Sequence, residues 1–280
     1  MKKGINVWSF PSNMSISSKL KITKDAGFDG IELSLDEEGE ISLKSSHQDL
    51  LKVKHLAEDF NIQIPSVATG LYWKYSFTSN DYFIRQKAKD IVKKQLEVAS
   101  ILGADTILVI PGIVGADFIP NCEIVEYHKA YERSLETFME LKKEAESFKV
   151  SIGLENVWNK FLLSPLEFRD FIDKINSSYV GIYLDVGNVL YTGYPEHWIK
   201  ILEGRIKKIH LKDFKQKIGN LNGFVDLLSG DVNFPKIIEN LKTTGYNGYL
   251  IAEMAPYKYY SDQIIYNTAR SLDRMLKDNV

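Results

Sequence analysis

The segments VSIGLE (150–155) and VGIYLD (180–185) are short apolar runs that each end in a carboxylate. Longer stretches with helical periodicity separate such runs along the chain, and this alternation is typical of repeated βα units around a parallel sheet. Eight units in 280 residues predict an α/β fold with one (β/α)8 TIM barrel domain over residues 1–280. The six other runs are residues 4–8, 30–35, 62–67, 105–110, 205–211 and 248–253.

The connections between the runs carry helix and turn signals. Apolar residues in segment 81–103 recur at steps of three and four, which predicts an amphipathic helix with Asp81 at its N-cap. Gly27, Gly103 and Gly245 each follow a helical pattern and precede an apolar run. Because glycine just past a helix adopts the left-handed conformation at low cost, we expect αβ turns there, at the barrel end opposite the active face.

The composition excludes several classes of protein. A net charge of -2 offers no broad positive surface, so we expect no nucleic-acid partner. No apolar run approaches the roughly 20 residues of a membrane span, and the initial MKKGINVWSF lacks the apolar stretch of a secretory signal. Cys122 is the only cysteine, so no internal disulfide can form. We expect a cytoplasmic protein without a membrane partner. The sequence does not decide between a monomer and a homo-oligomer.

Polar residues at the ends of apolar strands are candidates for an active site, because the carboxyl ends of barrel strands meet at one face. Since side chains alternate between the two faces of a strand, such residues converge when their face is directed inward. An acid at a strand end can also be a cap or pair with a lysine, but four polar groups at successive strand ends favour one shared site. The four are Glu155, Asp185, His210 and Glu253.

Three carboxylates and one imidazole make an oxygen-rich ligand set. Such a set leaves coordination positions for water or substrate oxygens. We therefore predict that these four side chains bind one divalent metal ion. The set suits Mn²⁺ best, with Mg²⁺, Co²⁺ or Zn²⁺ as alternatives.

At these residues the chain resembles the sugar phosphate isomerase/epimerase family, which has a xylose isomerase-like TIM barrel. The resemblance covers nearly the whole chain and is strongest to ketopentose 5-phosphate 3-epimerases and hexulose-6-phosphate isomerases. It implies that Glu155, Asp185, His210 and Glu253 ligate one divalent ion. The motifs that carry it are GFDGIELSLDE (27–37), LEN (154–156), LDVGN (184–188), HLKD (210–213), GDVNFPKII (230–238) and IAEM (251–254).

The residues also suit the chemistry of an epimerase. Epimerising a carbon beside a ketone requires removal of a proton from one face of an enediolate and its return to the other face. Glu155 and Glu253 come from strands that are separated by two others, so they are the predicted catalytic pair. The predicted substrate is a small sugar or sugar phosphate. The reaction that we favour is epimerisation of a ketose phosphate at C3.

Four polar residues are weaker candidates for contacts with the substrate. Asn156 and Asn188 lie just beyond predicted ligands and could bind sugar hydroxyls, although asparagine also forms turns at strand ends. Lys212 shares the strand face of His210, but so does Lys208; one lysine must then lie lower in the barrel, or the strand is distorted. Glu32 in GIELSL could hydrogen-bond in the site or pair with a lysine.

Two candidates lie in loops, and the phosphate has no evident cradle. Trp73 in GLYWKYSF could close over a ligand or pack its loop onto the barrel, and His197 could approach the site or begin a helix. No glycine-rich phosphate loop is recognisable. The candidate phosphate cations are Lys74, Lys212 and Lys215.

Several alternative functions share this fold. An apurinic endonuclease is disfavoured, because only His210 is placed as such a multi-metal site needs and the chain lacks a positive surface for DNA. An aldose/ketose isomerase, such as a hexulose-6-phosphate isomerase, uses a similar enediolate and stays open. An inosose or hydroxypyruvate enzyme and a non-catalytic sugar-binding barrel also stay open, because fold does not settle function.

Overall fold

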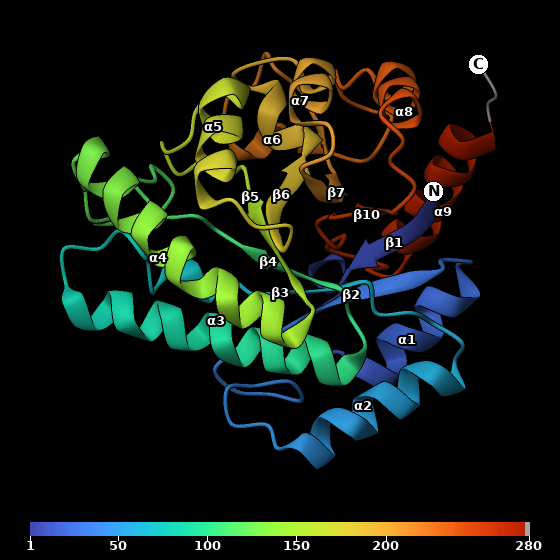
Figure 1. Cartoon of the computed structure of the whole chain (residues 1–280). Coiled ribbons are helices and arrows are strands. Elements are labelled where there is room, and N and C mark those ends of the chain that lie inside the picture. Colours follow the sequence, from blue (N-terminus) through green and yellow to red (C-terminus); the bar gives the residue numbers. More distant parts are fainter. Residues whose placement is uncertain (278–280) are drawn as a thin grey trace.

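Eight parallel strands close into a barrel at the centre of the molecule, as the eight apolar runs predict (Figure 1). The computed structural model describes residues 1–277. Around the barrel the strand order is β1-β10-β7-β6-β5-β4-β3-β2, so the first and the last strand pair with each other. The barrel strands are β1 (Lys2–Asn6), β2 (Gly30–Ser34), β3 (Ser66–Ala68), β4 (Thr106–Val109), β5 (Ser151–Glu155), β6 (Val180–Asp185), β7 (Ile206–Leu211) and β10 (Tyr249–Ala252).

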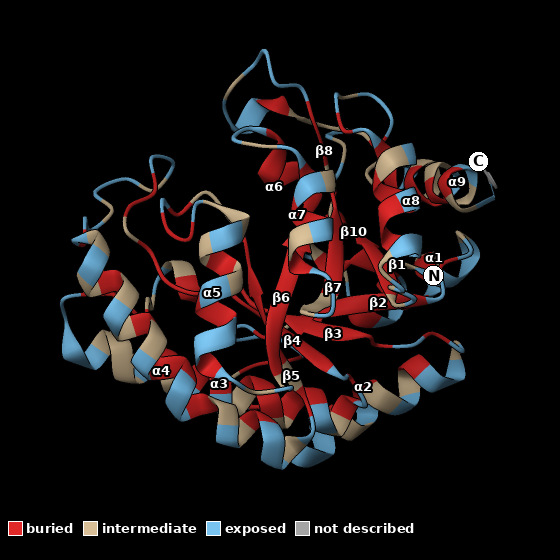
Figure 2. Ribbon diagram, turned by 45° about the horizontal axis from the view of Figure 1, so that its top comes forward, coloured by how far each residue is buried: buried red, intermediate tan, exposed pale blue. Residues whose placement is uncertain are grey.

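Helices surround the barrel and bury their apolar stripes against it; Figure 2 shows buried residues on the strands and exposed residues on the outer helix faces. None of the helices described between residues 1 and 277 has both the length and the apolar character that a membrane span needs. The helices are α1 (Ile16–Asp25), α2 (His47–Asp59), α3 (Tyr82–Leu102), α4 (Tyr127–Phe148), α5 (Pro165–Ile175), α6 (Val186–Leu190), α7 (Pro195–Leu202), α8 (Phe234–Thr243) and α9 (Gln263–Lys277).

The predicted helix and turn signals are confirmed where the structure tests them. The Asp81 side chain accepts a hydrogen bond from Phe83 N at 2.7 Å and caps α3. Gly27, Gly103 and Gly245 have φ values of +82°, +80° and +76°, which is the left-handed region that glycine tolerates best. These turns enter β2, β4 and β10 at the end of the barrel opposite the site.

One strand begins later than its apolar run. The sequence predicts a strand over 62–67, whereas β3 begins at Ser66. Pro65 has no N–H to donate to the neighbouring strand, so it interrupts the ladder. Only an isolated bridge between Gly30 and Gln63 precedes it.

Side chains that point into the barrel form a separate small core. Ala68, Leu108, Tyr183 and Ile251 pack together there, with Tyr249 toward the lower end. Gly153 on β5 leaves room for the tyrosine ring, because a Cβ at this position would approach Tyr183 to 3.1 Å. The barrel is therefore filled with side chains below the site and is not an open channel.

Lys208 and Lys212 lie at opposite ends of the barrel, which explains how both can share the strand face of His210. Lys208 Nζ meets Asp105 Oδ1 at 2.5 Å at the lower end. Lys212, directly after β7, lies at the upper end. The strand is also irregular beside β6, where the register shifts between Ile182 and Tyr183.

Candidate active site

The four predicted side chains meet at the carboxyl ends of neighbouring strands. Glu155 ends β5, Asp185 ends β6, His210 lies opposite Asp185 in β7, and Glu253 directly follows β10. One ligand atom from each lies within 4.8 Å of the other three. The arrangement thus joins three carboxylates and one imidazole in a buried cluster that could hold a metal ion.

The imidazole of His210 is held in an orientation that suits a metal ligand. Its Nε2 lies 2.6 Å from Glu32 Oε1, an arrangement that suits an N–H donated to this carboxylate. Its Nδ1 faces Glu155 Oε1 at 3.1 Å and Glu253 Oε2 at 3.2 Å. A carboxylate that fixes the far nitrogen of a ligating histidine is a common partner in metal sites.

One carboxylate oxygen of Asp185 is buried in the cluster without a hydrogen-bond donor. Its Oδ1 accepts a hydrogen bond from Asn188 N at 2.8 Å, where Asp185 is the N-cap of α6. Its Oδ2 is buried and makes no hydrogen bond, although the Lys212 ammonium lies 3.2 Å away as an ion-pair partner. An unsatisfied buried carboxylate oxygen that faces His210 Nδ1 at 3.9 Å fits a divalent cation between them.

The electrostatics of the cluster favour added positive charge. Burial raises the pKa of Glu155 to about 7, against the attraction of His210 and Lys212. Burial also raises the pKa of Asp185. Burial would do the same to Glu253, but Lys212 and His210 outweigh it and lower that pKa to about 2. Burial opposes a charged His210, yet the surrounding glutamates raise its pKa well above the usual value. A proton or a metal cation among these carboxylates would reduce the repulsion between their negative charges.

Glu32 lies one layer below the cluster, which corrects the expectation that it contacts substrate. Its side chain has no exposed surface and does not line the cavity above. Besides His210, its oxygens accept hydrogen bonds from Asn6 Nδ2 and Ser66 Oγ, both at 2.6 Å, and from the Tyr183 hydroxyl. Glu32 therefore fixes the histidine rather than a sugar.

The two candidate asparagines have different positions. The Asn156 amide donates to Asp185 O at 2.9 Å and accepts from Asp185 N at 2.8 Å, so it fixes the backbone of a cluster residue. Asn188 donates to Asn156 O at 3.0 Å, and it also lines the cavity. Only Asn188 is placed to meet a ligand in that cavity.

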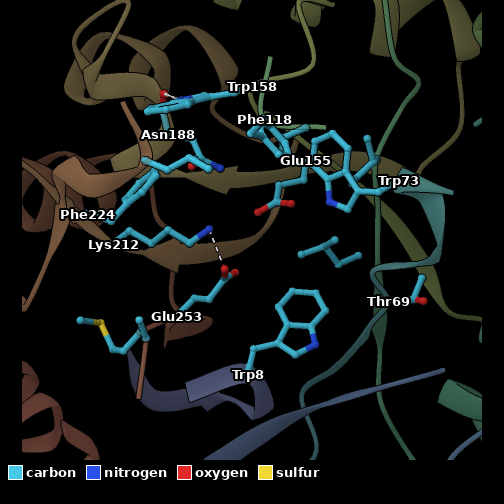
Figure 3. A pocket seen from close by; sticks show the side chains of 16 residues that line it. Trp8, Thr69, Trp73, Phe118, Glu155, Trp158, Asn188, Lys212, Phe224 and Glu253 are labelled. Carbon is cyan, nitrogen blue, oxygen red and sulfur yellow. Dashed lines mark hydrogen bonds and ion pairs between the residues drawn. The ribbon is translucent and has the colours of Figure 1, made fainter. Parts of the chain in front are cut away.

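A cavity of about 360 Å³ opens above the cluster. Figure 3 shows the carboxylates of Glu155 and Glu253 directed into it, with the Lys212 ammonium beside Glu253. Lys212 Nζ lies 2.7 Å from Glu253 Oε1. Aromatic rings form much of the remaining wall: Trp8, Trp73, Phe118, Trp158 and Phe224.

The loop candidates divide between the cavity and the surface. Trp73 lines the cavity and packs edge-on against Phe118 at 5.0 Å. His197 is exposed in the first turn of α7, and its ring is tilted against that of Tyr194 with the centroids 5.3 Å apart. Of its two predicted roles, the structure fits the start of a helix and corrects the contact with substrate. Lys74 pairs with Glu37 at 2.8 Å and lies outside the cavity wall.

Sequence reasoning missed most of the aromatic wall. Trp8 falls within a predicted strand, 4–8, but lies in a short 3-10 helix that follows β1. Phe118, Trp158 and Phe224 lie in segments whose path the sequence does not specify. The available signal was their position after strands, since loops after barrel strands form the active face.

Comparisons with known proteins show the family of this chain. Residues 20–276 match the family model "Xylose isomerase-like TIM barrel", so the chain belongs to the xylose isomerase-like TIM barrel family. The "Putative L-ribulose-5-phosphate 3-epimerase SgbU" of Haemophilus influenzae is 27% identical over 90% of this chain and 88% of its own length. The L-ribulose-5-phosphate 3-epimerase UlaE of Shigella flexneri is 23% identical over 90% of this chain and 86% of its own.

Solved structures show the same fold. The D-psicose 3-epimerase from Clostridium cellulolyticum H10, solved with D-tagatose, superposes with a TM-score of 0.82 at 19% identity, over 99% of this chain and 98% of that one. An L-ribulose 3-epimerase superposes with a TM-score of 0.78 at 20% identity, over 98% and 93%.

Proposed function

We propose that this chain is a metal-dependent ketose phosphate 3-epimerase that acts on a substrate of the L-ribulose 5-phosphate or L-xylulose 5-phosphate type. At the coarser level, the chain is a sugar epimerase or isomerase. The relatives, which it matches over 88% and 86% of their own length, are named as epimerases. The single observation that carries the epimerase part of the proposal is the placement of two glutamates from separate strands beside one cavity.

The strand order separates the two proposed catalytic groups. Glu155 ends β5 and Glu253 follows β10, with β6 and β7 between them. Both carboxylates line the same cavity (Figure 3). One can therefore remove the C3 proton from one face of the sugar while the other returns a proton to the opposite face.

The residues around these glutamates fit a cation and a polar ligand. The side chains that would hold the cation are Glu155, Asp185, His210 and Glu253, with Mn²⁺ as the proposed ion and Mg²⁺, Co²⁺ or Zn²⁺ as alternatives. When bound, the ion supplies Lewis-acid stabilisation of negative charge on substrate oxygens. Asn188 and Lys212 are the proposed contacts for sugar hydroxyls, and Trp73 helps to exclude water.

The phosphate part of the proposal is supported by the names of the relatives rather than by a visible cradle. Within the described chain, Lys212 is the only cationic side chain that lines the cavity, and it already pairs with Glu253 and Asp185. Lys215 lies outside the wall and Lys74 is paired elsewhere. A phosphate would therefore be held by backbone N–H groups of the rim together with Lys212.

The decisive experiment follows deuterium from D₂O into ketopentose 5-phosphates and the free ketoses. We expect label at C3 and inversion there, with higher kcat/KM for the phosphates. Label only at C1 or C2, with an aldose as product, would establish an isomerase. Equal kcat/KM for both substrate classes would refute the phosphate preference, and absence of exchange with metal bound would leave a sugar-binding barrel.

The same proposal places the protein in the cytoplasm, with a small molecule as its partner and with neither nucleic acid nor a membrane. A homo-oligomer stays open. Size-exclusion chromatography with light scattering would settle the assembly state.

A further inference from the structure

The motif HLKD ends in Asp213, an aspartate that belongs neither to the cluster nor to the cavity lining. The motif GDVN (230–233) lies beside it. Asp213 follows Lys212 and is 1% exposed. It begins segment 213–232, which leaves β7 and returns to α8. We call residues 214–230 of this segment the strap.

Asp213 holds both ends of the strap with one carboxylate. Its Oδ1 accepts hydrogen bonds from Phe214 N at 2.8 Å and Val232 N at 3.1 Å, and its Oδ2 accepts from Gly230 N at 2.8 Å. Phe214 is where the strap begins, and Gly230 is where it ends. Both oxygens of Asp213 are therefore occupied by backbone N–H groups.

The glycine of GDVN is required by the same contact. A Cβ on Gly230 would lie 2.3 Å from Asp213 Oδ1 and 2.7 Å from Phe214 N. No real side chain tolerates these distances, so the carboxylate or the strap would have to move. Sequence and geometry thus agree that the returning chain passes directly over Asp213.

The clamped strap forms part of the cavity wall. At the start of the strap β8 (Asp213–Phe214) pairs with β9 (Phe224–Val225), so Phe214 lies opposite Phe224. The two rings pack at 5.1 Å, and both contact Trp158, at 5.4 Å and 5.3 Å. Phe224 and Trp158 line the cavity (Figure 3).

The strap also contacts Lys212, the one cationic side chain that the described residues contribute to the cavity wall. Lys212 Nζ lies over the Phe224 ring, 5.6 Å from its centroid, while it pairs with Glu253. A displaced Phe224 would remove this contact and open one side of the cavity. The metal cluster itself has no residue in the strap.

We propose that Asp213 is a positioning residue that holds the strap against the cavity and thereby sets Phe224 and Lys212 for substrate binding. Asp213 belongs neither to the cavity lining nor to the cluster of proposed metal ligands. Its effect on binding is transmitted through the strap. The kinetic part of this inference rests on the proposed function, whereas the structural part does not.

The test compares Asp213→Asn with Asp231→Asn in the full chain. Asparagine has one acceptor oxygen, so it cannot replace both oxygens of Asp213. Asp231 uses a single oxygen, which accepts from Gln216 N at 2.9 Å, and asparagine can keep that bond. Asp231→Asn is therefore a matched control with the same loss of charge.

Hydrogen exchange measures the clamp independently of activity. In Asp213→Asn we expect the amides of residues 214–232 to exchange at least about tenfold faster, as for loss of a charge-assisted hydrogen bond. Exchange in the barrel strands and the affinity for Co²⁺ should stay unchanged. The control should match wild type, and Gly230→Ala should reproduce the fast exchange without any loss of charge.

Kinetics then connect the clamp to substrate binding. We expect KM to rise about tenfold in Asp213→Asn and Gly230→Ala, with kcat within about threefold, because a wall contacts substrate and transition state alike. Native exchange in the strap overturns the clamp. Fast exchange with unchanged KM, or a fall in kcat alone, overturns its role in binding. Unfolding of both variants indicates a general structural role and also overturns the proposal. If no ketose is turned over by wild type, the exchange result still decides the clamp.

Discussion

The two ends of the barrel bury polar side chains in different ways. At the lower end Lys208 is 6% exposed and pairs with Asp105, which is itself 72% exposed, so one positive charge meets one negative charge. At the upper end four carboxylates surround two groups that can carry positive charge: Glu32, Glu155, Asp185 and Glu253 around His210 and Lys212. A balanced pair closes the barrel, whereas an excess of buried acid marks the end that awaits a cation and a substrate.

Loss of the cation should break the upper end completely. Chelation should abolish turnover, and Mn²⁺ or Co²⁺ should restore it, because the buried carboxylates need a positive charge between them. His210→Ala and Asp185→Asn should each lose metal on elemental analysis. His55→Ala, on α2, should keep it. Full activity in a preparation shown to be metal-free would contradict the metal centre.

Removing either base should have the next largest effect. Glu155→Gln and Glu253→Gln keep the size of the side chain but remove the base, so we expect turnover to fall at least about a hundredfold. Steady-state rates with saturating metal are the measurement. Elemental analysis of each variant controls for lost metal, and near wild-type turnover in either variant would remove that residue from the mechanism.

A smaller loss should follow from a change below the cluster. Glu32→Gln leaves Nε2 of His210 without its carboxylate, and we expect metal affinity to fall about 10- to 100-fold. Competition with a chelating dye measures this without an assay for turnover. Asn188→Ala is the comparison, because the Asn188 side chain lines the cavity and bonds Asn156 O instead of His210. This variant should bind metal normally. Unchanged affinity in Glu32→Gln would show that the histidine orients itself.

The lower end should respond in stability alone. Asp105→Asn removes the charge that faces buried Lys208, and we expect the free energy of unfolding to fall by about 1 kcal/mol. Urea unfolding measures the loss. Activity and metal content should remain within twofold of wild type; a large loss of either would mean that the two ends are coupled.

The sequence predicted the barrel and the cluster for the same reason. Apolar runs that end in a polar residue are constrained twice, by burial along the run and by the convergence of strand ends, and Glu155 and Asp185 satisfy both constraints. Glu32 resisted prediction because it is the third residue of β2, not its last, so it points into the layer below. Parity identifies the face of a strand, but not the height in the barrel.

The cavity wall resisted prediction for another reason. Trp158 and Phe224 come together only after the strap folds back over Asp213, and this contact joins residues that are far apart in the chain. Local propensity carries no information about such a meeting. His197 shows the opposite error, since nearness in sequence to LDVGN did not bring its side chain to the cavity.

The pairing of β1 with β10 has a consequence for the order in which the protein matures. Lys2 pairs with Tyr249 and Ile5 with Ala252, so β1 has no partner on this side until β10 has left the ribosome. At roughly 5 to 20 residues per second, β1 remains an open edge for about ten seconds or more. Glu253 follows Ala252 directly, so closure of the barrel and completion of the ligand set are the same late event. A nascent chain can thus hold neither a closed barrel nor the complete set of proposed ligands until β10 and Glu253 have left the ribosome.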